Sequence, residues 1–423
     1  MHLELGIINI RDIRFGEQTT IVNGVLYINK AELIAEVIQD SRLFTAKVEL
    51  ARVGEEARII PVKDVIEPRV KTDGSGDFFP GVVGKTRTVG SGITHVLRGT
   101  TVMSVGRVIG YQEGFVDMTG PAARYSPFSQ TNNVVLVLNA VEGLEPHAHE
   151  EAMRIAGLRA ANYLGQAGKN VTPDEVMTYE LNPVTDRSLP RVVYIYTLLS
   201  EGLLHDTYVY GVDAKWILPS IIHPNEIMDG AIVSGNCVSA CDKHTTYHHL
   251  NNPVIQELYR RHGIDLNFIG IIITNLNVRL ADKQRSADYA SKLARFVGAE
   301  GAIITEEGFG NPDADLMMLC KKTEEYGIRT VLITDEYAGS DGSSQSLADA
   351  VPQADAVVSV GNANEMISLP PMKRIIGELK SAEVISGGFV GSLVANGGLN
   401  IEIQAIMGAT CQLGFGKLTA RGY

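Results

Sequence analysis

"NFIGIIITNLNVRLADKQRSADYASKLARFVGAEGAIITEEG", residues 267–308, decides the class of fold. The runs at 267–274 and 301–308 are short and mainly apolar, which is typical of buried strands. Between them, the segment 286–298 has apolar residues three to four positions apart, the spacing of an amphipathic helix. Buried strands separated by such helices predict a parallel sheet with helices on both faces.

The same alternation extends over the second half of the chain. Further segments predict helices: 252–263 ("NPVIQELYRRHG"), 312–327 ("PDADLMMLCKKTEEYG", with Pro312 placed to start it) and 346–354 ("SLADAVPQA"). Others predict strands: 329–338 ("RTVLITDEYA") and 355–361 ("DAVVSVG"). We therefore expect a doubly wound, mostly parallel sheet in this half.

Upstream of this region the pattern changes. Strand patterns lie at 134–143, 191–199 and 206–214, and a helix pattern at 149–168 ends near Gly165. From 1 to about 125, short alternating runs are broken by Gly, Asp and Pro, which predicts a β-rich region. We expect an α/β protein with three parts: a β-rich domain at 1–125, an α/β region at 126–236 and an α/β domain at 237–423.

Length and charge limit the partners. A chain of 423 residues is long enough for two or three domains. The formal net charge of −12 argues against nucleic acid, because phosphate binders usually carry a basic face. The start, "MHLELGIINIRDIRFGEQ", lacks the pattern of a secretory signal, so we expect a cytoplasmic protein. The most apolar window, 267–278, is shorter than the roughly 20 residues of a membrane-spanning helix, so no membrane span is predicted.

"GFGNPDAD" at 308–315 lies where a strand pattern ends and a helix pattern begins. Open α/β sheets bind ligands at this kind of position. The stretch lacks the spaced glycines of a dinucleotide site, however, and Asp313 and Asp315 would repel an anion. We interpret it as ordinary strand-to-helix turn chemistry and predict no nucleotide.

Two groups of histidines invite a metal-site interpretation. His147 and His149 in "EPHAHEE" precede a helix pattern, which favours the polar start of a helix over a metal site. His244, His248 and His249 follow a pair of cysteines, but the spacing matches no standard structural zinc site. No metal is predicted.

The chain has four cysteines, Cys237, Cys241, Cys320 and Cys411, which are too sparse for a disulfide framework. Cys237 and Cys241 form a Cys-X3-Cys pair, one residue longer than the redox Cys-X2-Cys motif. A thiol relay is one interpretation of this pair. Burial as small apolar side chains is the other.

The step Gly235-Asn236-Cys237 permits a self-cleavage reaction. The Cys237 sulfur can attack the carbonyl carbon of Asn236, and Gly235 gives the backbone the freedom to bend. Water would then cut the resulting thioester and leave an intact cysteine. Loss of the Cys237 α-proton and sulfur would instead give dehydroalanine, which hydrolyses with loss of ammonia to a pyruvoyl group. That ketone can form a Schiff base with a substrate amine and withdraw electrons.

Cyclisation of Asn236 is a further route, and it too would leave Cys237 intact. The residues alone do not choose among these outcomes, because most Asn-Cys bonds are inert.

Longer segments add the information that the dipeptide lacks. In chain order they are "LELGIINIRDIRFGE", "IIPVKDVIEPRVK", "GRVIGYQEGFVDMTGP", "EEAMRIAGLRAANYLGQAGKN", "DGAIVSGNCVSACDKHTTYHHLNNPVI" and "EIQAIMGATCQLGFGKLT". In these segments the chain resembles the component B proproteins of the glycine, sarcosine and betaine reductases of amino-acid-fermenting anaerobes. The resemblance covers nearly the whole chain. It favours this family over the related proline reductase proprotein.

The resemblance implies a subunit of an oxidoreductase that matures by cutting itself between Asn236 and Cys237. Residues 1–236 and 237–423 would stay together, and Cys237 would become the pyruvoyl group. That group would bind a small amine substrate as a Schiff base for reductive C–N cleavage. The implied partners are a separate selenoprotein subunit of component B, the selenoprotein component A and the acetyl-phosphate-forming component C. Glycine and sarcosine can condense with a ketone, whereas the betaine nitrogen cannot.

Neighbouring residues have hypothetical roles in this scheme. Cys241 would protect or orient the site, Asp242 or His244 would move the α-proton during maturation, and Lys243 would attract the substrate carboxylate. Each is equally consistent with a turn residue or a solvated charge. Two competing functions stay open: a non-catalytic scaffold of the complex with an intact Asn236–Cys237 bond, and the thiol relay.

Overall fold

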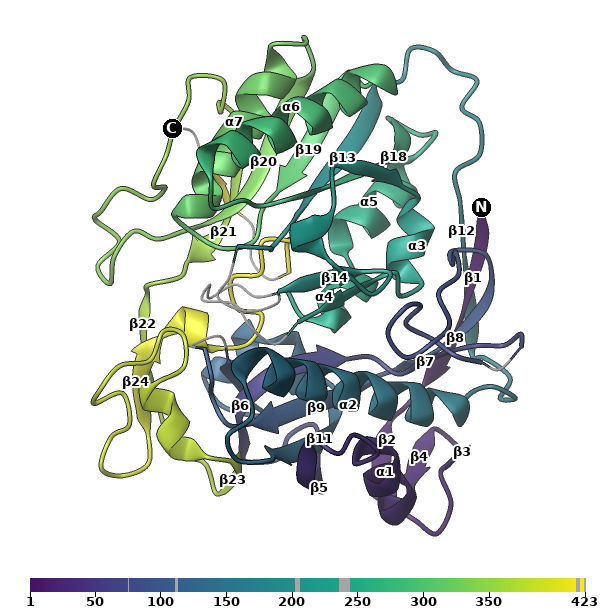
Figure 1. Cartoon of the computed structure of the whole chain (residues 1–423), viewed down its shortest axis with the longest axis vertical. Helices are drawn as coiled ribbons and strands as arrows, with labels where there is room; N and C mark the ends of the chain where they lie inside the picture. Colours follow the sequence, from purple (N-terminus) through teal and green to yellow (C-terminus); the bar gives the residue numbers. More distant parts are fainter. Residues whose placement is uncertain (75, 111–112, 202–205, 236–243, 416–418, 422–423) are drawn as a thin grey trace.

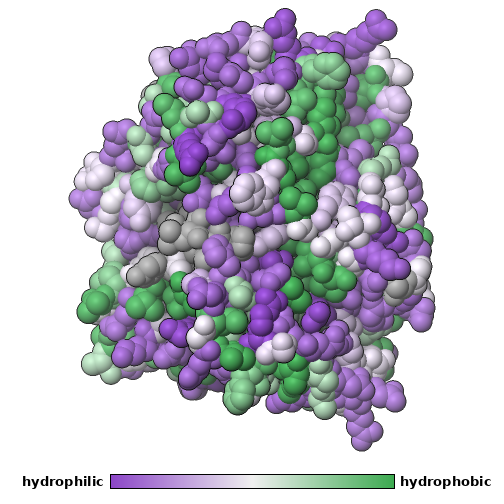
Figure 2. Space-filling view, viewed as in Figure 1, coloured by the Kyte–Doolittle hydropathy of each residue, from purple (hydrophilic) through white to green (hydrophobic). Residues whose placement is uncertain are grey.

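The computed structural model describes residues 1–423 except 75, 111–112, 202–205, 236–243, 416–418 and 422–423. Figure 1 shows the two main parts of the molecule. A mainly parallel sheet with its helices fills the upper half, and the N-terminal sheets with a long helix fill the lower half. Hydrophilic residues and smaller apolar areas alternate over the face seen in Figure 2.

The upper half is built on the doubly wound sheet that the sequence predicts. Its strands lie in the order β16-β18-β13-β19-β20-β21-β25. The parallel strands are β13 (Arg191–Leu198), β18 (Asn267–Asn275), β19 (Gly301–Thr305), β20 (Arg329–Glu336) and β21 (Val357–Asn362). The antiparallel edge strands are β16 (Ser220–Ile222) and β25 (Thr419–Arg421). The predicted α/β class with a mostly parallel sheet is confirmed.

Helices cover both faces of this sheet because its strands are apolar on both sides. Tyr194 and Tyr196 of β13 pack in the core that includes α5 (Pro253–Arg261). Val193 and Ile195 point the other way, into the core formed with α6 (Leu280–Phe296) and α7 (Asn311–Glu324). Alternate residues of one strand thus serve two cores, as a pleated strand buried on both faces requires.

The short helix predicted at 346–354 is wrong, because this segment is irregular. Pro352 cannot donate a backbone hydrogen bond, which removes a helical turn near the end of the segment. The N–H of Ala348 donates instead to Oδ2 of Asp313 at 2.6 Å. Leu347 and Val351 still pack against the core below α7. The apolar spacing therefore marks residues that cover the sheet without forming a helix.

The lower half is β-rich, as the first part of the sequence predicts. One sheet has the order β12-β1-β8-β7, and another has the order β10-β6-β9-β11-β5 with β23 paired to β6. The first contains β1 (His2–Asn9), β7 (Arg69–Lys71), β8 (Gly92–Arg98) and β12 (Glu175–Glu180). The second contains β5 (Leu43–Ala51), β6 (Ala57–Ile66), β9 (Thr100–Gly106), β10 (Gly114–Asp117), β11 (Asn132–Ala140) and β23 (Arg374–Gly377).

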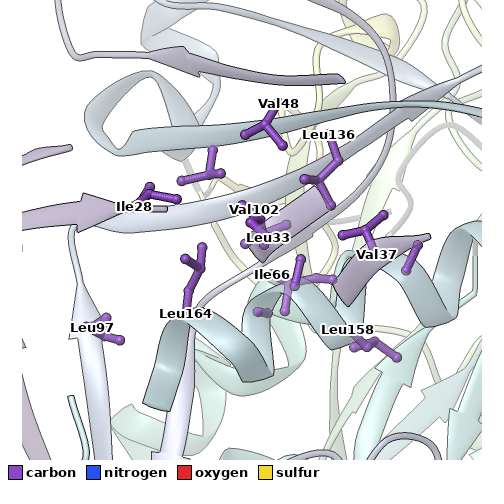
Figure 3. Packing of buried hydrophobic residues seen from close by; sticks show 14 of the residues in the cluster. Ile28, Leu33, Val37, Val48, Ile66, Leu97, Val102, Leu136, Leu158 and Leu164 are labelled. Carbon is purple, nitrogen blue, oxygen red and sulfur yellow. The ribbon is translucent and has the colours of Figure 1, made fainter. Parts of the chain in front are cut away.

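Smaller elements complete this half. They are β2 (Asp12–Phe15), β3 (Thr20–Val22), β4 (Val25–Ile28), α1 (Lys30–Val37), η1 (Ala122–Tyr125), η2 (Pro127–Gln130), β22 (Met366–Leu369), η4 (Leu379–Glu383), β24 (Leu399–Glu402) and η5 (Ile403–Ala405). The helix predicted after β11 is α2 (Pro146–Gln166). Figure 3 shows its Leu164 directed at a core with Ile66, Val102 and Leu136, and Leu158 belongs to the same cluster of buried residues.

The connection from β13 to β18 carries the segment of interest. It contains β14 (Thr207–Val209), β15 (Val212–Asp213), η3 (Ala214–Trp216), β16, α3 (Pro224–Met228), β17 (Ile232–Ser234), α4 (Thr246–Leu250) and α5. Strands β15, β14 and β17 form a small antiparallel sheet of their own. Residues 236–243 lie between β17 and α4 in the chain. Among the described residues, no helix is long and apolar enough to cross a membrane.

Buried ion pairs join this connection to the lower half. Nζ of Lys71 in β7 donates to Oδ2 of Asp229 at 2.6 Å, and Thr94 donates to the other oxygen of Asp229 at 2.6 Å. Arg69, also in β7, pairs with Glu67 and donates to the carbonyl oxygen of Met228 at 2.6 Å. Buried charges are tolerated when they are fully paired, so these contacts fix α3 and α4 firmly on the N-terminal sheet.

Candidate active site

The parallel strands define where a ligand crevice should lie. In chain order they run β13, β18, β19, β20 and β21, but in space β13 sits between β18 and β19. The connection after β13 therefore leads to one side, and the connection after β19 leads to the other. Open α/β sheets bind ligands outside the carboxyl ends of the strands at such a switch point. Here those ends are Leu198 of β13 and Thr305 of β19.

Both flanks of residues 236–243 are hydrogen-bonded close to this switch point. On the upstream side, the N–H of Gly235 donates to the carbonyl oxygen of Asp206, in the connection that follows β13, at 2.5 Å. On the downstream side, the N–H of His244 donates to Oε1 of Glu307 at 2.6 Å. Glu307 is the second residue after β19. The chain therefore enters and leaves this segment at the carboxyl side of the sheet.

The residues that the sequence singled out divide between described and undescribed parts of the chain. Asn236, Cys237, Cys241, Asp242 and Lys243 lie outside the described residues, and their predicted roles stay predictions.

The two remaining candidates are described. Gly235 and His244 stand at the two ends of the segment, and His244 is completely buried. The described part of the site therefore consists of Gly235, His244 and the residues that contact them.

His244 is bound by Glu307 through its backbone, and its ring lies beside the same carboxyl group. Besides the backbone bond, its Nδ1 lies 3.3 Å from Oε2 of Glu307, although not in line for a hydrogen bond. Neither ring nitrogen of His244 has a hydrogen-bond partner among the described residues. Burial, and next the neighbouring rings of His249 and His248, holds the pKa of His244 well below its usual range. The imidazole is therefore neutral at neutral pH.

A second buried imidazole faces the first. The ring centroids of His244 and His249 are 6.0 Å apart. Nδ1 of His249 is hydrogen-bonded to the hydroxyl of Tyr196 at 2.5 Å, and its Nε2 has no partner among the described residues. Burial lowers the pKa of His249 to about 3. Tyr196 in turn stacks on Tyr194, with ring centroids 5.2 Å apart, so the position of His249 is fixed from the sheet.

His248, by contrast, has a structural role. It occupies the third position of α4 and forms a capping box with Thr245, whose N–H donates to Nδ1 of His248 at 3.1 Å. The helix begins at Thr246, so His248 and His249 belong to it and His244 precedes it. A capping box satisfies backbone groups at a helix start, so Nδ1 of His248 is occupied there, and its ring packs against Phe128 and Phe415.

Thr246 joins the two flanks to each other. Its hydroxyl donates to Oδ2 of Asp64 in β6 at 2.7 Å and accepts the N–H of Ser234 at 3.0 Å. Oδ1 of Asp64 also accepts the N–H of Thr246 at 2.9 Å. One buried hydroxyl thus connects the last residue of β17, the first residue of α4 and the N-terminal sheet.

Buried carboxyl groups line the carboxyl ends of β19 and β20. Glu306 accepts a hydrogen bond from the hydroxyl of Thr334 and lies close to the carboxyl group of Asp313. Burial, and next the charge of Asp313, raises the pKa of Glu306 well above its usual range. Burial also raises the pKa of Asp313. Two carboxyls so close together in a buried place share a proton, because they cannot both be charged at low cost.

The turn at 308–315 has the structure that the sequence predicts. Helix α7 begins at Asn311, with Pro312 in its first turn. Asp315 pairs with Lys283 of α6, and burial raises the pKa of Asp315 to about 6. The carboxyl group of Asp315 therefore has a structural partner on the neighbouring helix. Among the described residues, no group of His, Cys, Asp and Glu is arranged to hold a metal ion.

Sequence reasoning missed Glu307, His249 and Tyr196 as members of this site. The available signal was the pair Glu306-Glu307, which follows a buried strand run at the place where α/β sheets bind ligands. Cys320 and Cys411 are buried, and neither forms a disulfide with another described residue.

The chemistry of these side chains suits a neutral carbonyl group. A charged cofactor would leave its charge facing buried neutral imidazoles, whereas His244 and His249 can each offer a ring N–H to a carbonyl oxygen. Unpartnered nitrogens in a buried place cost free energy unless a further group bonds to them. The described flanks are thus compatible with a pyruvoyl group formed within 236–243.

The described residues form an α/β protein in which both flanks of residues 236–243 are bonded near the switch point of the sheet. Comparison with known proteins identifies the class. The model of the family described as glycine/sarcosine/betaine reductase component B subunits matches residues 1–421. The chain therefore belongs to this family of reductase complex components.

Individual relatives agree with this assignment. The chain is 57% identical over 430 residues to the glycine reductase complex component B subunits alpha and beta of Acetoanaerobium sticklandii, covering 100% of both chains. It is 56% identical over 428 residues to the sarcosine reductase complex component B subunit alpha of Peptoclostridium acidaminophilum, again covering both completely. The betaine reductase counterpart of that organism is 41% identical, with 96% of this chain and 95% of the relative covered. No solved structure matches the chain.

Proposed function

We propose that this chain is the proprotein of the pyruvoyl-bearing subunits of component B, and that it cuts itself between Asn236 and Cys237. The pyruvoyl group made from Cys237 would supply a ketone that condenses with the substrate amine and draws electrons from its C–N bond. Reductive cleavage of that bond would then be completed by a nucleophile from a partner subunit. The reaction class is reductive deamination of a small amino acid or its N-methyl derivative.

One observation carries this proposal: both flanks of the segment are fixed beside the switch point, among neutral buried imidazoles. Gly235 is bonded to the connection after β13, and His244 is bonded to Glu307 after β19. Ring closure by the Cys237 sulfur requires a bent backbone held in one geometry, and fixed ends on both sides favour such a geometry. The printed names of the relatives add support, because a single chain in Acetoanaerobium sticklandii carries the name of two subunits.

The chain's own residues would move the protons of maturation. A base must take the α-proton of Cys237, and a neutral imidazole at the downstream flank is suited to do so. His244 is the nearer in sequence, and Glu307 fixes its position. His249, fixed by Tyr196, would exchange a proton with that first ring or with the carbonyl oxygen. Elimination would release the Cys237 sulfur as the thiocarboxylate of Asn236, and one water would then convert the dehydroalanine into the ketone with loss of ammonia.

The substrate is proposed to be glycine or sarcosine. Both have a nitrogen that can condense with a ketone, whereas the quaternary nitrogen of betaine cannot. The identities of 57% and 56% to the glycine and sarcosine relatives, against 41% to the betaine relative, agree with this choice. The partners would be a selenoprotein subunit of component B, the selenoprotein component A and the acetyl-phosphate-forming component C. A cytoplasmic location remains part of the proposal.

Intact mass spectrometry of the purified protein tests the central step. We expect fragments 1–236 and 237–423, the second lacking the sulfur and the amine of Cys237 and gaining one hydrazone with phenylhydrazine. Cys237→Ala should stay uncut, whereas Cys320→Ala, a buried thiol in α7, should be cut normally. A single uncut chain in an active complex would favour the scaffold. A Cys237 thiol that still reacts with iodoacetamide would favour the thiol relay.

A further inference from the structure

A cavity of about 760 Å³ opens at the carboxyl ends of another pair of parallel strands. Strands β9 and β11 are parallel neighbours in the N-terminal sheet, and they end at Gly106 and Ala140. Helix α2 starts immediately after β11, and its N-terminus borders the same cavity. The combination of strand ends and a helix start repeats, on a small scale, the arrangement that binds anions in α/β proteins.

The polar groups at this cavity are suited to an anion. Helix α2 is 21 residues long, and no side chain caps its N-terminus, so backbone N–H groups at its start face outward with the positive end of the helix dipole. Arg107, directly after β9, lines the cavity, and no described residue pairs with its guanidinium. Glu142 also lines the cavity, and because both it and Arg107 are exposed, solvent and salt screen the two opposite charges alike.

His149 supplies a second, independent indication. It lies in the first turn of α2, lines the cavity and is only 6% exposed. Its Nδ1 has no hydrogen-bond partner among the described residues. Burial, and next the charge of the nearby Lys63, lowers the pKa of His149 to about 4. His149 lies near the buried Lys63–Glu113 ion pair, so the charge of Lys63 is already compensated, while the unpartnered Nδ1 of His149 can still bond to a ligand.

The remaining wall is apolar. Val108, Ile109, Leu138, Leu144 and Val384 line it. The volume lies within the range of small-molecule sites and is far more than a bare inorganic ion needs. We infer that this cavity binds a small organic anion, with a carboxylate or phosphate group at the start of α2 beside Arg107 and an apolar body against these side chains. This inference is independent of the pyruvoyl proposal.

Isothermal titration calorimetry with phenyl phosphate and benzoate tests this inference and identifies the anionic group. We expect at least one of them to bind with a dissociation constant in the low millimolar range or tighter, and neutral benzyl alcohol to bind at least tenfold more weakly. Arg107→Ala should weaken the better anion about tenfold. Arg187→Ala, an exposed arginine of the 181–190 loop, should leave it unchanged.

A second variant tests the same cavity in case Arg107→Ala does not fold. Val141→Glu places a carboxylate at an exposed position of the cavity lining and should also weaken binding without changing the melting temperature. No heat of binding from either anion at 20 mM would overturn the inference. Equal binding of benzyl alcohol, or equal losses in Arg107→Ala and Arg187→Ala, would overturn it as well. None of these results bears on cleavage at Asn236, which is measured separately by mass.

Discussion

His244 and Glu307 lie in direct contact, although 63 positions separate them in the chain. The N–H of His244 donates to one carboxyl oxygen of Glu307 at 2.6 Å, and its ring nitrogen lies 3.3 Å from the other. A carboxylate that binds the backbone N–H of a histidine and lies against its ring restricts where that ring can lie. The predicted role of Glu307 is therefore to position His244 for proton transfer.

Glu307→Gln should slow self-cleavage roughly tenfold to hundredfold, within the range that positioned acid–base groups supply. The amide keeps an acceptor for the His244 N–H but loses the charge beside the ring. Glu306→Gln is the matched control, because Glu306 is equally buried but contacts Thr334 and Asp313 instead. The two rates are followed by intact mass after expression at low temperature. Equal slowing in both variants would show a general packing effect.

The two stacked tyrosines provide a second matched pair. Tyr196→Phe removes the hydrogen bond to His249, and it should cost about 1–3 kcal/mol of stability and also slow cleavage. Tyr194→Phe removes a bond to Thr305 and should cost a similar amount without slowing cleavage. Chemical denaturation measures the first effect and the rate of fragment formation measures the second. A normal cleavage rate in Tyr196→Phe would remove His249 from the proton path.

Thr246→Val should destabilise the protein by about 2–4 kcal/mol, because it leaves the Asp64 carboxylate and the Ser234 N–H short of a partner in a buried place. Thr274→Val in β18 is the control. The hydroxyl of Thr274 is buried without a hydrogen-bond partner among the described residues, so replacing it with a methyl group should be neutral or stabilising. Thermal unfolding compares the two. Similar losses would contradict the role assigned to the Thr246 hydroxyl.

The buried carboxyl pair predicts a pH dependence of stability. The pKa of Glu306 is raised in the folded protein above its ordinary value of 4.5, so the folded state holds a proton that the unfolded state releases above that value. The stability contributed by the neutral carboxyl is complete below about pH 4.5 and is lost as the pH rises through the folded pKa. Glu306→Gln carries no such proton. Its melting temperature should therefore rise relative to the wild type between pH 5 and pH 8.5, and a constant difference would refute the assignment.

Much of the fold follows from sequence pattern, because strands buried on both faces and helices buried on one leave distinct spacings. The strands β13, β18, β19, β20 and β21 were all predicted in this way. The segment 346–354 has the same spacing but is irregular, since Pro352 and a backbone bond to Asp313 override the pattern. The pairing of strands that are far apart in the chain does not follow from such local spacing. Nothing local in the sequence indicates that Arg374 of β23 lies beside Ala57 of β6.

The site was predicted only in part, for a similar reason. The Gly-Asn-Cys step is a local chemical pattern, so Asn236 and Cys237 could be singled out from the sequence. The contacts of Glu307 with His244, and of Tyr196 with His249, form across the sheet and the β13–β18 connection. Single-sequence reasoning shows that a carboxylate follows a strand, but it does not show which side chain that carboxylate will meet.

The position of β13 between β18 and β19 has a consequence for the cut protein. After cleavage at Asn236, the upstream fragment would still supply β13 to the centre of a sheet whose other parallel strands belong to the downstream fragment. The downstream fragment would in turn supply β23 to the upstream sheet, beside β6. Each product would thus hold a strand of the other. The nicked protein would behave as an interlocked heterodimer that salt or dilution does not separate, and its unfolding would become a bimolecular, concentration-dependent process.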